Sequence, residues 1–146
     1  RPGTEPVPLA CGLGAACEWL APLLKEISAG MIALREELYE LLKNGFQGLK
    51  RFVPPGECLS NTLCISFPGL SGSLILDRAD DVMASTGAAC HDRSVKISHV
   101  LSAMGIGHQD AMGMIRLSLG VMTTKEEIRT AAASILRAVT ELTKER

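Results

Sequence analysis

The sequence has few aromatic residues and almost no net charge. Phe, Trp and Tyr make up 3% of the 146 residues, and 15 basic residues balance 16 acidic ones. Proteins that bind single-stranded nucleic acid stack bases on aromatic side chains, and proteins that bind duplexes or anionic membranes carry a basic excess. No apolar run has the length needed to cross a bilayer. We therefore expect neither nucleic acid nor a membrane as a partner.

Close cysteine pairs are also missing. The five cysteines are odd in number and form no Cys-x-x-Cys pair, which argues against a disulfide framework and favours a reducing compartment. We predict a cytoplasmic protein. The sequence lacks an initiator Met and an apolar signal core, so we expect it to be a fragment of a longer chain. The cysteines are Cys11, Cys17, Cys58, Cys64 and Cys90.

Familiar catalytic and metal-binding patterns are absent as well. No Walker or dinucleotide-binding glycine pattern occurs. Cys90 and the three histidines, His91, His99 and His108, match no zinc-finger spacing, so we expect no metal site. A thiol hydrolase would need Cys90 together with a histidine and an orienting group. His99 and Asp110 are the candidates for that alternative, and the sequence does not show that they meet Cys90.

Helical periodicity marks both ends of the chain. After an extended, proline-containing entry over residues 1–8, apolar residues recur at helical spacing from Leu9, and Pro22 either begins a second helix or kinks one long helix. Asn44-Gly45 ends this region. Its apolar stripe is interpreted as core, with a partner-binding face as the alternative. The stripe comprises Leu24, Ile27, Met31, Leu34, Leu38, Leu41 and Leu42, and the polar side Arg35, Glu36, Glu37, Glu40 and Lys43.

The last predicted helix begins with a capping box. Thr123-Thr124-Lys125-Glu126-Glu127 places a threonine three residues before a glutamate in either of two registers. An apolar face follows and runs to the end of the chain. That face consists of Ile128, Ala132, Ile135, Val139 and Leu142.

Short strands and helices alternate between these ends. Strands are predicted at Thr62–Phe67, Val82–Ser85 and Ile115–Leu119, and helices at about 72–81, with Leu74, Ile75 and Ala79 buried, and at 98–104. The fold class is therefore α/β, a small sheet covered by helices. The predicted organisation is an extended segment (1–8), linking helices (9–44) and a small α/β domain (45–146).

A run of small residues, Ser85-Thr86-Gly87-Ala88-Ala89, leads directly to Cys90. His91, Arg93 and Lys96 follow, and such an electropositive setting favours the thiolate form of a cysteine. The alternative is a small buried thiol, because free cysteine is among the most buried residue types.

Arg116 lies in the middle of an apolar predicted strand. A charged group in that position needs a partner. The partner could be a carboxylate of the protein itself or the carboxylate of a ligand, which an arginine binds through two parallel hydrogen bonds. The sequence leaves both open.

Several motifs in one order resemble a known family. The chain is similar to the C-terminal part of the cysteine desulfurases and selenocysteine lyases, pyridoxal-phosphate enzymes of the class-V aminotransferase type. The Gly-Ala-Ala-Cys-His form around Cys90 resembles selenocysteine lyases more than typical desulfurases. The matching stretches are Arg1–Glu5, Gly12–Ala16, Asn61–Leu63, Ser66–Gly69, Ser85–Cys90, Ser98–Leu101, Ile115–Gly120 and Thr123–Ile128.

The resemblance implies roles for three residues. Cys90 corresponds to the catalytic cysteine, which the family carries on a mobile loop, and Arg116 to the arginine that binds the substrate carboxylate. Thr4 corresponds to a threonine that reaches the cofactor phosphate of the neighbouring subunit, which implies a homodimer. The fold implied is the small C-terminal domain of a fold-type-I pyridoxal-phosphate enzyme. A sulfur or selenium acceptor protein is a further possible partner.

The same resemblance shows what this chain does not contain. None of its lysines stands in the family's Ser-x-His-Lys setting, so we predict that the chain alone cannot hold pyridoxal phosphate through a lysine and is inactive alone. The predicted function is that of a selenocysteine lyase fragment that helps to convert selenocysteine or cysteine to alanine. A cysteine desulfurase that supplies persulfide sulfur for iron–sulfur assembly is one alternative. A non-catalytic dimerisation or docking domain is another.

Overall fold

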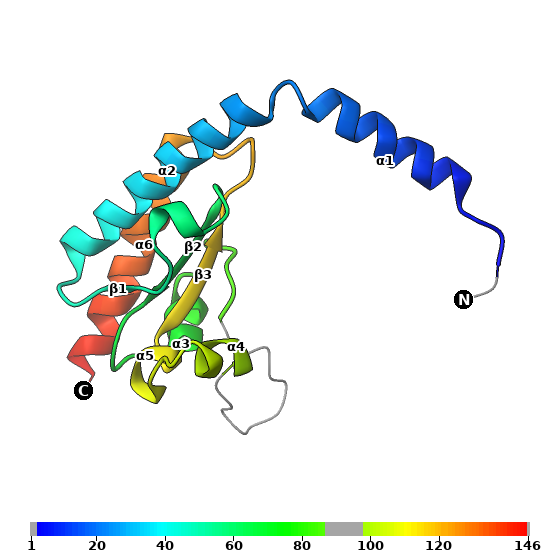
Figure 1. Ribbon diagram of the computed structural model, residues 1–146. Helices are drawn as coiled ribbons and strands as arrows, with labels where there is room; N and C mark the ends of the chain where they lie inside the picture. Colours follow the sequence, from blue (N-terminus) through cyan, green and yellow to red (C-terminus); the bar gives the residue numbers. More distant parts are fainter. Residues whose placement is uncertain (1–2, 87–97, 146) are drawn as a thin grey trace.

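The computed structural model describes residues 3–86 and 98–145, so the predictions on Cys90, His91, Arg93 and Lys96 lie outside the described residues. Its centre is a three-stranded antiparallel sheet in the order β1-β2-β3 (Figure 1). The short edge strand β1 was not predicted, whereas the predictions for β2 and β3 are confirmed within one residue. The strands are β1 (Lys50–Arg51), β2 (Thr62–Ser66) and β3 (Met114–Ser118).

Three helices cover one face of this sheet, as the predicted α/β layering requires. Side chains alternate along a strand, and those of Leu63, Ile65, Ile115 and Leu117 enter the core. The longest helices, α2 and α6, pack against each other over this face, and α3 packs against both α6 and β3 (Figure 1). The covering helices are α2 (Leu24–Gly45), α3 (Gly72–Arg78) and α6 (Lys125–Lys144).

The C-terminal helix α6 confirms its prediction in detail. All five residues of its predicted apolar face are buried. Of the two possible capping registers, the chain uses Thr124 with Glu127: the Glu127 backbone N–H donates to Thr124 Oγ1, and the Thr124 backbone N–H donates to Glu127 Oε2. The cap satisfies two backbone donors that a helix start otherwise leaves without partners.

Three short elements lie at the ends of the strands. The first is predicted from the sequence, and Gly105 ends it with a positive φ of 74°; the other two were not predicted. These elements are α4 (His99–Ala103), α5 (His108–Met112) and the 3₁₀ turn η1 (Pro55–Glu57).

Two predictions in the middle of the chain were wrong. Residues 82–85 form no strand, because only Ser85 pairs with the sheet, in a single bridge to Arg116. Leu74 of α3 is 50% exposed, whereas Ile75 and Ala79 are buried as predicted. A seven-residue helix presents only a narrow face to the core, and Leu74 lies outside it.

The first helix, α1 (Val7–Leu20), extends away from the rest of the protein (Figure 1). It begins at Val7, so residues 7 and 8 are helical and do not belong to the extended segment predicted over residues 1–8. Pro8 lies in the first turn, where proline is tolerated. The region forms two helices, which bend by 74°, and Pro22 lies in the turn between them and not in the first turn of α2, as one of the two predictions had it. No residue of α1 is buried, so its apolar side is exposed.

The predicted core stripe of α2 holds only in the second half of the helix. Leu38 and Leu42 are buried, whereas Leu24 is 53% exposed, because the first turns of α2 extend past the sheet (Figure 1). Within the described residues, no single helix is long and apolar enough to span a membrane. The bent pair of α1 and α2 meets that criterion only when the two are counted together, by length and composition alone.

Candidate functional site

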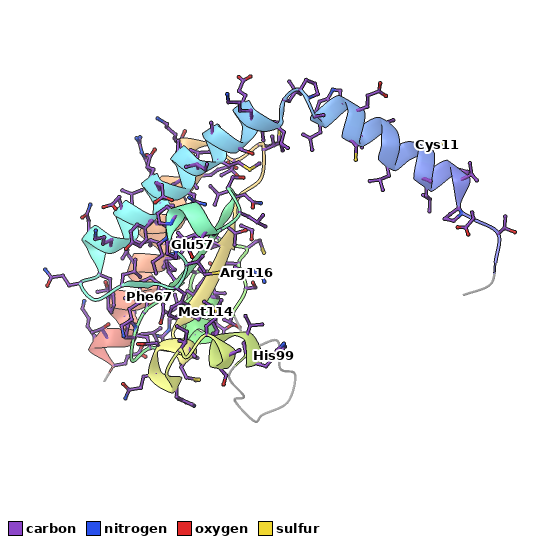
Figure 2. The ribbon with its side chains drawn as sticks, viewed as in Figure 1. Cys11, Glu57, Phe67, His99, Met114 and Arg116 are labelled. Atoms are coloured by element: carbon purple, nitrogen blue, oxygen red, sulfur yellow. The ribbon has the colours of Figure 1, made fainter. Side chains whose placement is uncertain are left out.

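Arg116 lies at the centre of β3, on the face opposite the helical core. Its neighbours in sequence, Ile115 and Leu117, point into the core, so strand alternation turns the Arg116 side chain to the other face. Arg116 is exposed. Figure 2 shows Arg116 and Met114 along β3, with His99 at the start of α4. This face of the sheet, which α5 covers at the end near Ser66, therefore presents a guanidinium in the described part of the chain.

Backbone hydrogen bonds fix which residues flank Arg116. Its N–H donates to Ser85 O at 2.7 Å, and its C=O accepts from Ser85 N at 3.2 Å. Because both backbone groups of Arg116 face Ser85, its pairing with Cys64 on β2 carries no hydrogen bond between the two residues. In antiparallel sheets such pairs are the narrow ones, with Cα atoms about 4.5 Å apart. Ser85 and Cys64 thus lie on opposite sides of Arg116.

Every described sheet position around Arg116 is uncharged. Among the residues that the structure describes, no carboxylate forms an ion pair with the Arg116 side chain. Of the two predicted partners, a carboxylate of the protein itself is therefore not found in this part of the chain. A guanidinium that is exposed and has no carboxylate partner among the described residues suits a ligand carboxylate. The surrounding positions are Thr62, Cys64, Ser66, Ser85, Met114 and Ser118.

The Cys64 thiol is the ionisable group nearest to Arg116 in the sheet register. Burial raises the pKa of Cys64 above its ordinary value of 9.0; Arg116 lowers it by a smaller amount, and nearby Cys58 raises it. Desolvation disfavours the charged form of a thiol. The Cys64 side chain is therefore neutral near pH 7.

The other predicted site residues are not brought together with Arg116 in the described structure. Cys90 lies outside the described residues. Thr4 is exposed and precedes α1, and the N-terminal end of α1 is far from β3 (Figure 1). The predicted contact of Thr4 with a neighbouring subunit's cofactor therefore stays a prediction.

The residues of the hydrolase alternative do not form a catalytic pair here. The Asp110 carboxylate binds Lys50 Nζ at 2.6 Å, and no hydrogen bond joins it to His99 in the described part of the chain. The same residues contain no group of three or more His, Cys, Asp or Glu side chains that could hold a metal ion.

The described lysines and the hollow beside α6 do not form a binding site for pyridoxal phosphate. All five described lysines are exposed, and those with ion pairs, Lys43 and Lys50, bind Glu40 and Asp110. The lining of a hollow of about 460 Å³ between α2, β3 and α6 includes three carboxylate residues, Asp81, Glu126 and Glu127, which would repel a phosphate. This hollow is therefore not suited to the phosphate of the cofactor.

A partly buried charge cluster, which the sequence analysis missed, supports the edge of the sheet. Arg35 was predicted to lie on the polar side of its helix, but it is fully buried. Its Nη1 donates to Leu59 O at 2.7 Å and to Cys58 Sγ at 3.0 Å, and its Nη2 donates to Pro55 O at 3.1 Å. These acceptors replace the water that a buried guanidinium loses.

Glu36 links Arg35 to a second arginine. Its carboxylate accepts from Arg35 Nε at 2.8 Å and from Arg51 Nη1 and Nη2 at 2.6 and 2.9 Å. The hydrogen bonds from Arg51 lower the pKa of Glu36 below its ordinary value of 4.5; burial opposes this effect, and Arg35 adds to it. Through these hydrogen bonds and ion pairs, the cluster connects α2 to β1 and to the segment around η1. The only feature of the sequence that pointed to the burial of Arg35 was its position next to the apolar stripe of the helix.

Comparisons with known proteins agree with the resemblance drawn from the motifs. The aminotransferase class-V family model matches residues 1–130. The chain is 39% identical over 131 residues to "Cysteine desulfurase IscS" of Methanosarcina thermophila, covering 88% of this chain and 32% of that protein. It is 36% identical over 150 residues to "Selenocysteine lyase" of Homo sapiens, covering 97% of this chain and 34% of that protein.

Solved structures show the same likeness. A NifS-like protein superimposes with a TM-score of 0.81 at 32% identity, covering 97% of this chain and 36% of that one. A NifS-like protein from Rickettsia africae gives 0.76 at 26% identity, covering 99% and 36%. The chain thus spans about a third of the length of the relatives it matches. Cysteine desulfurases and selenocysteine lyases are pyridoxal-phosphate-dependent enzymes. With this family model over most of its length, the chain belongs to the aminotransferase class-V family.

Proposed function

We propose that this chain is the C-terminal part of a pyridoxal-phosphate-dependent selenocysteine lyase, which removes selenium, or sulfur, from selenocysteine or cysteine and leaves alanine. The observation that carries the proposal is the exposed Arg116, which has no carboxylate partner among the described residues. An amino-acid substrate always carries an α-carboxylate, and Arg116 would bind it through two charge-assisted hydrogen bonds. The complete protein would act in the cytoplasm as a homodimer, with Thr4 serving the neighbouring subunit.

Cys90 is the proposed catalytic thiol. The Ser85 backbone is hydrogen-bonded to Arg116, and Cys90 follows five residues later in the sequence. Five residues of extended chain span at most about 18 Å, so covalent connectivity allows Cys90 to act on a substrate held by Arg116. With cysteine as substrate, the C–S bond breaks, the sulfur becomes a persulfide on Cys90, and a proton adds to the substrate carbon to give alanine. This exchange needs no external oxidant.

Cysteine desulfurase activity is the alternative within the same family, because proteins of both names are similar to this chain. The two functions differ in what happens to the sulfur or selenium atom of the substrate. A desulfurase passes the persulfide from its cysteine to an acceptor protein, whereas a lyase releases selenium. The Gly-Ala-Ala-Cys-His sequence around Cys90 favours the lyase.

A docking or dimerisation role is supported by a separate observation. Helix α1 has no buried residue, and its apolar side chains include Leu13 at 68% and Trp19 at 68% exposure. Exposed apolar patches of this kind mark surfaces that contact other protein. This role is compatible with catalysis by the complete protein.

The test is turnover of the full-length protein with each amino acid, measured as alanine release. We expect wild-type protein to convert selenocysteine faster than cysteine. The Cys90→Ala variant should lose cysteine turnover, because the thiol proposed to accept the sulfur is removed, and keep part of its selenocysteine turnover, because selenium leaves more readily. Folding of the variant is checked by its absorbance with bound pyridoxal phosphate. Alanine release from neither amino acid, or full cysteine turnover by Cys90→Ala, contradicts the proposal.

A further inference from the structure

The residue opposite Arg116 in the sheet has no role in the proposed function so far. Cys64 pairs with Arg116 in the β2–β3 register. Its backbone C=O accepts from Phe52 N at 3.1 Å, on the other side of β2, and both backbone groups of Arg116 face Ser85. The pair therefore has the narrow spacing, in which the two side chains are closest. Any charge at position 64 would act directly on the Arg116 guanidinium.

The sheet positions diagonal to Arg116 are occupied by Thr62 and Ser66, which are also neutral. Opposite charges at directly paired positions of an antiparallel sheet attract. Position 64 is thus the place where a protein would most easily neutralise Arg116 with a carboxylate of its own, and a thiol stands there instead.

We propose that Cys64 is a positioning residue for Arg116: it fills the closest cross-strand position with an uncharged side chain, so that the guanidinium remains available to an α-carboxylate. This inference rests on the proposed function, since it requires that Arg116 binds the substrate. Cys64 acts through Arg116 and not on the reacting atoms.

Burial keeps the thiol neutral, because it raises the pKa of Cys64 despite the opposing effect of Arg116. The charged and titratable groups that act on this thiol are Arg116 from β3 and Cys58 from the segment before β2. Cys58 in turn accepts a hydrogen bond from Arg35. Because Cys64 is half-buried, a carboxylate placed there would be only weakly screened by water.

The test compares Cys64→Asp with Cys64→Asn in the full-length protein. The two side chains have nearly the same shape and differ in charge. We expect the KM for the amino acid to be about tenfold higher in the Asp variant than in the Asn variant, with a much smaller difference in kcat, because the new carboxylate competes with the substrate for Arg116. In an Arg116→Gln background the same pair should differ by less than twofold. Equal KM values in the Arg116 background overturn the inference.

Two further measurements keep the outcomes separate. If the Asp variant does not fold, Ser118→Asp is compared with Ser118→Asn, at an exposed position two residues along the same strand face; a twofold to fourfold rise in KM supports the inference and no rise overturns it. Failure of the proposed function would be seen differently, because wild-type protein would release no alanine. If the protein turns over its substrate but its KM does not respond to a charge at position 64 or 118, the proposed function stands and the role of Cys64 is contradicted.

Discussion

The carbonyl oxygen of Met114 lies where the side chain of residue 72 would begin. A Cβ atom added to Gly72 would overlap this oxygen and make a tight contact, at 3.1 Å, with the carbonyl carbon behind it. Gly72 stands in the first turn of α3 and is buried, and Met114 begins β3. The absence of a side chain at position 72 thus lets α3 approach the strand that carries Arg116.

Gly72→Ala should therefore destabilise the protein. Both obstructing atoms are backbone, which cannot rotate away as a side chain would, so we expect a loss of about 3 kcal/mol in the free energy of unfolding. Gly30→Ala in α2 is the matched control, since nothing lies within 4 Å of its added Cβ, and it should stabilise the helix by about 0.5–1 kcal/mol. Urea denaturation of both variants measures the difference. Equal effects would show that α3 is free to move away from β3.

Removing the buried guanidinium should be costly as well. Arg35→Met fills a similar volume but leaves Glu36 with one arginine fewer, and it removes the charged donor to the carbonyl oxygens of Pro55 and Leu59. Breaking a buried charged group away from its partners costs about 3 kcal/mol or more. Arg129→Met is the control, because its side chain is 67% exposed and has one ion pair, with Glu37. We expect the control to change the free energy of unfolding by less than about 0.5 kcal/mol.

Arg35 also shows where sequence reasoning fails. The apolar faces of α6 and of the second half of α2 were predictable, because helical periodicity is a local pattern. The burial of Arg35 depends on acceptors 20 and 24 residues away, in a segment whose path no local pattern specifies. The same holds for Arg116. Its strand was predictable, but the register that places Cys64 and Ser85 beside it is set by pairing between distant segments.

The charge cluster predicts how stability depends on pH. The pKa of Glu36 is lowered in the folded protein, mainly by hydrogen bonds from Arg51. A carboxyl group whose pKa is lowered by folding stabilises the folded protein at pH values above its ordinary pKa of 4.5. That stability is lost as the pH falls through the pKa of the folded state. Glu36→Gln should therefore reduce the stability difference between pH 7 and pH 3. Glu40→Gln, an exposed control on the same helix, should leave it unchanged. Thermal unfolding across this pH range provides the measurement, and parallel curves for wild type and Glu36→Gln would contradict the expectation.

The capping box of α6 offers a smaller and cleaner test. Thr124→Ala removes the Oγ1 atom that accepts from the Glu127 backbone N–H, and losing such a cap costs about 1 kcal/mol. Thr130→Ala, at an exposed position inside the same helix, replaces threonine with a better helix former and should be neutral or slightly stabilising. Chemical denaturation distinguishes the two. A neutral Thr124→Ala would show that the cap adds nothing to stability.

Arg116 itself is tested by removing its charge. Arg116→Gln keeps a polar side chain but replaces the two-pronged guanidinium, and a hydrogen bond to a charged group is worth about 1.5–3 kcal/mol. We expect the full-length protein to show a roughly 10- to 100-fold lower kcat/KM for the proposed amino-acid substrate, arising mostly from KM. Arg129→Gln, an exposed arginine on α6, is the control and should keep the wild-type value. Selectivity provides the second readout: an amino acid amide, which lacks the carboxylate, should be a poor substrate for wild-type protein and should lose little further on Arg116→Gln. If the amide and the free amino acid lose activity equally, Arg116 supports the structure of the site and does not bind the carboxylate.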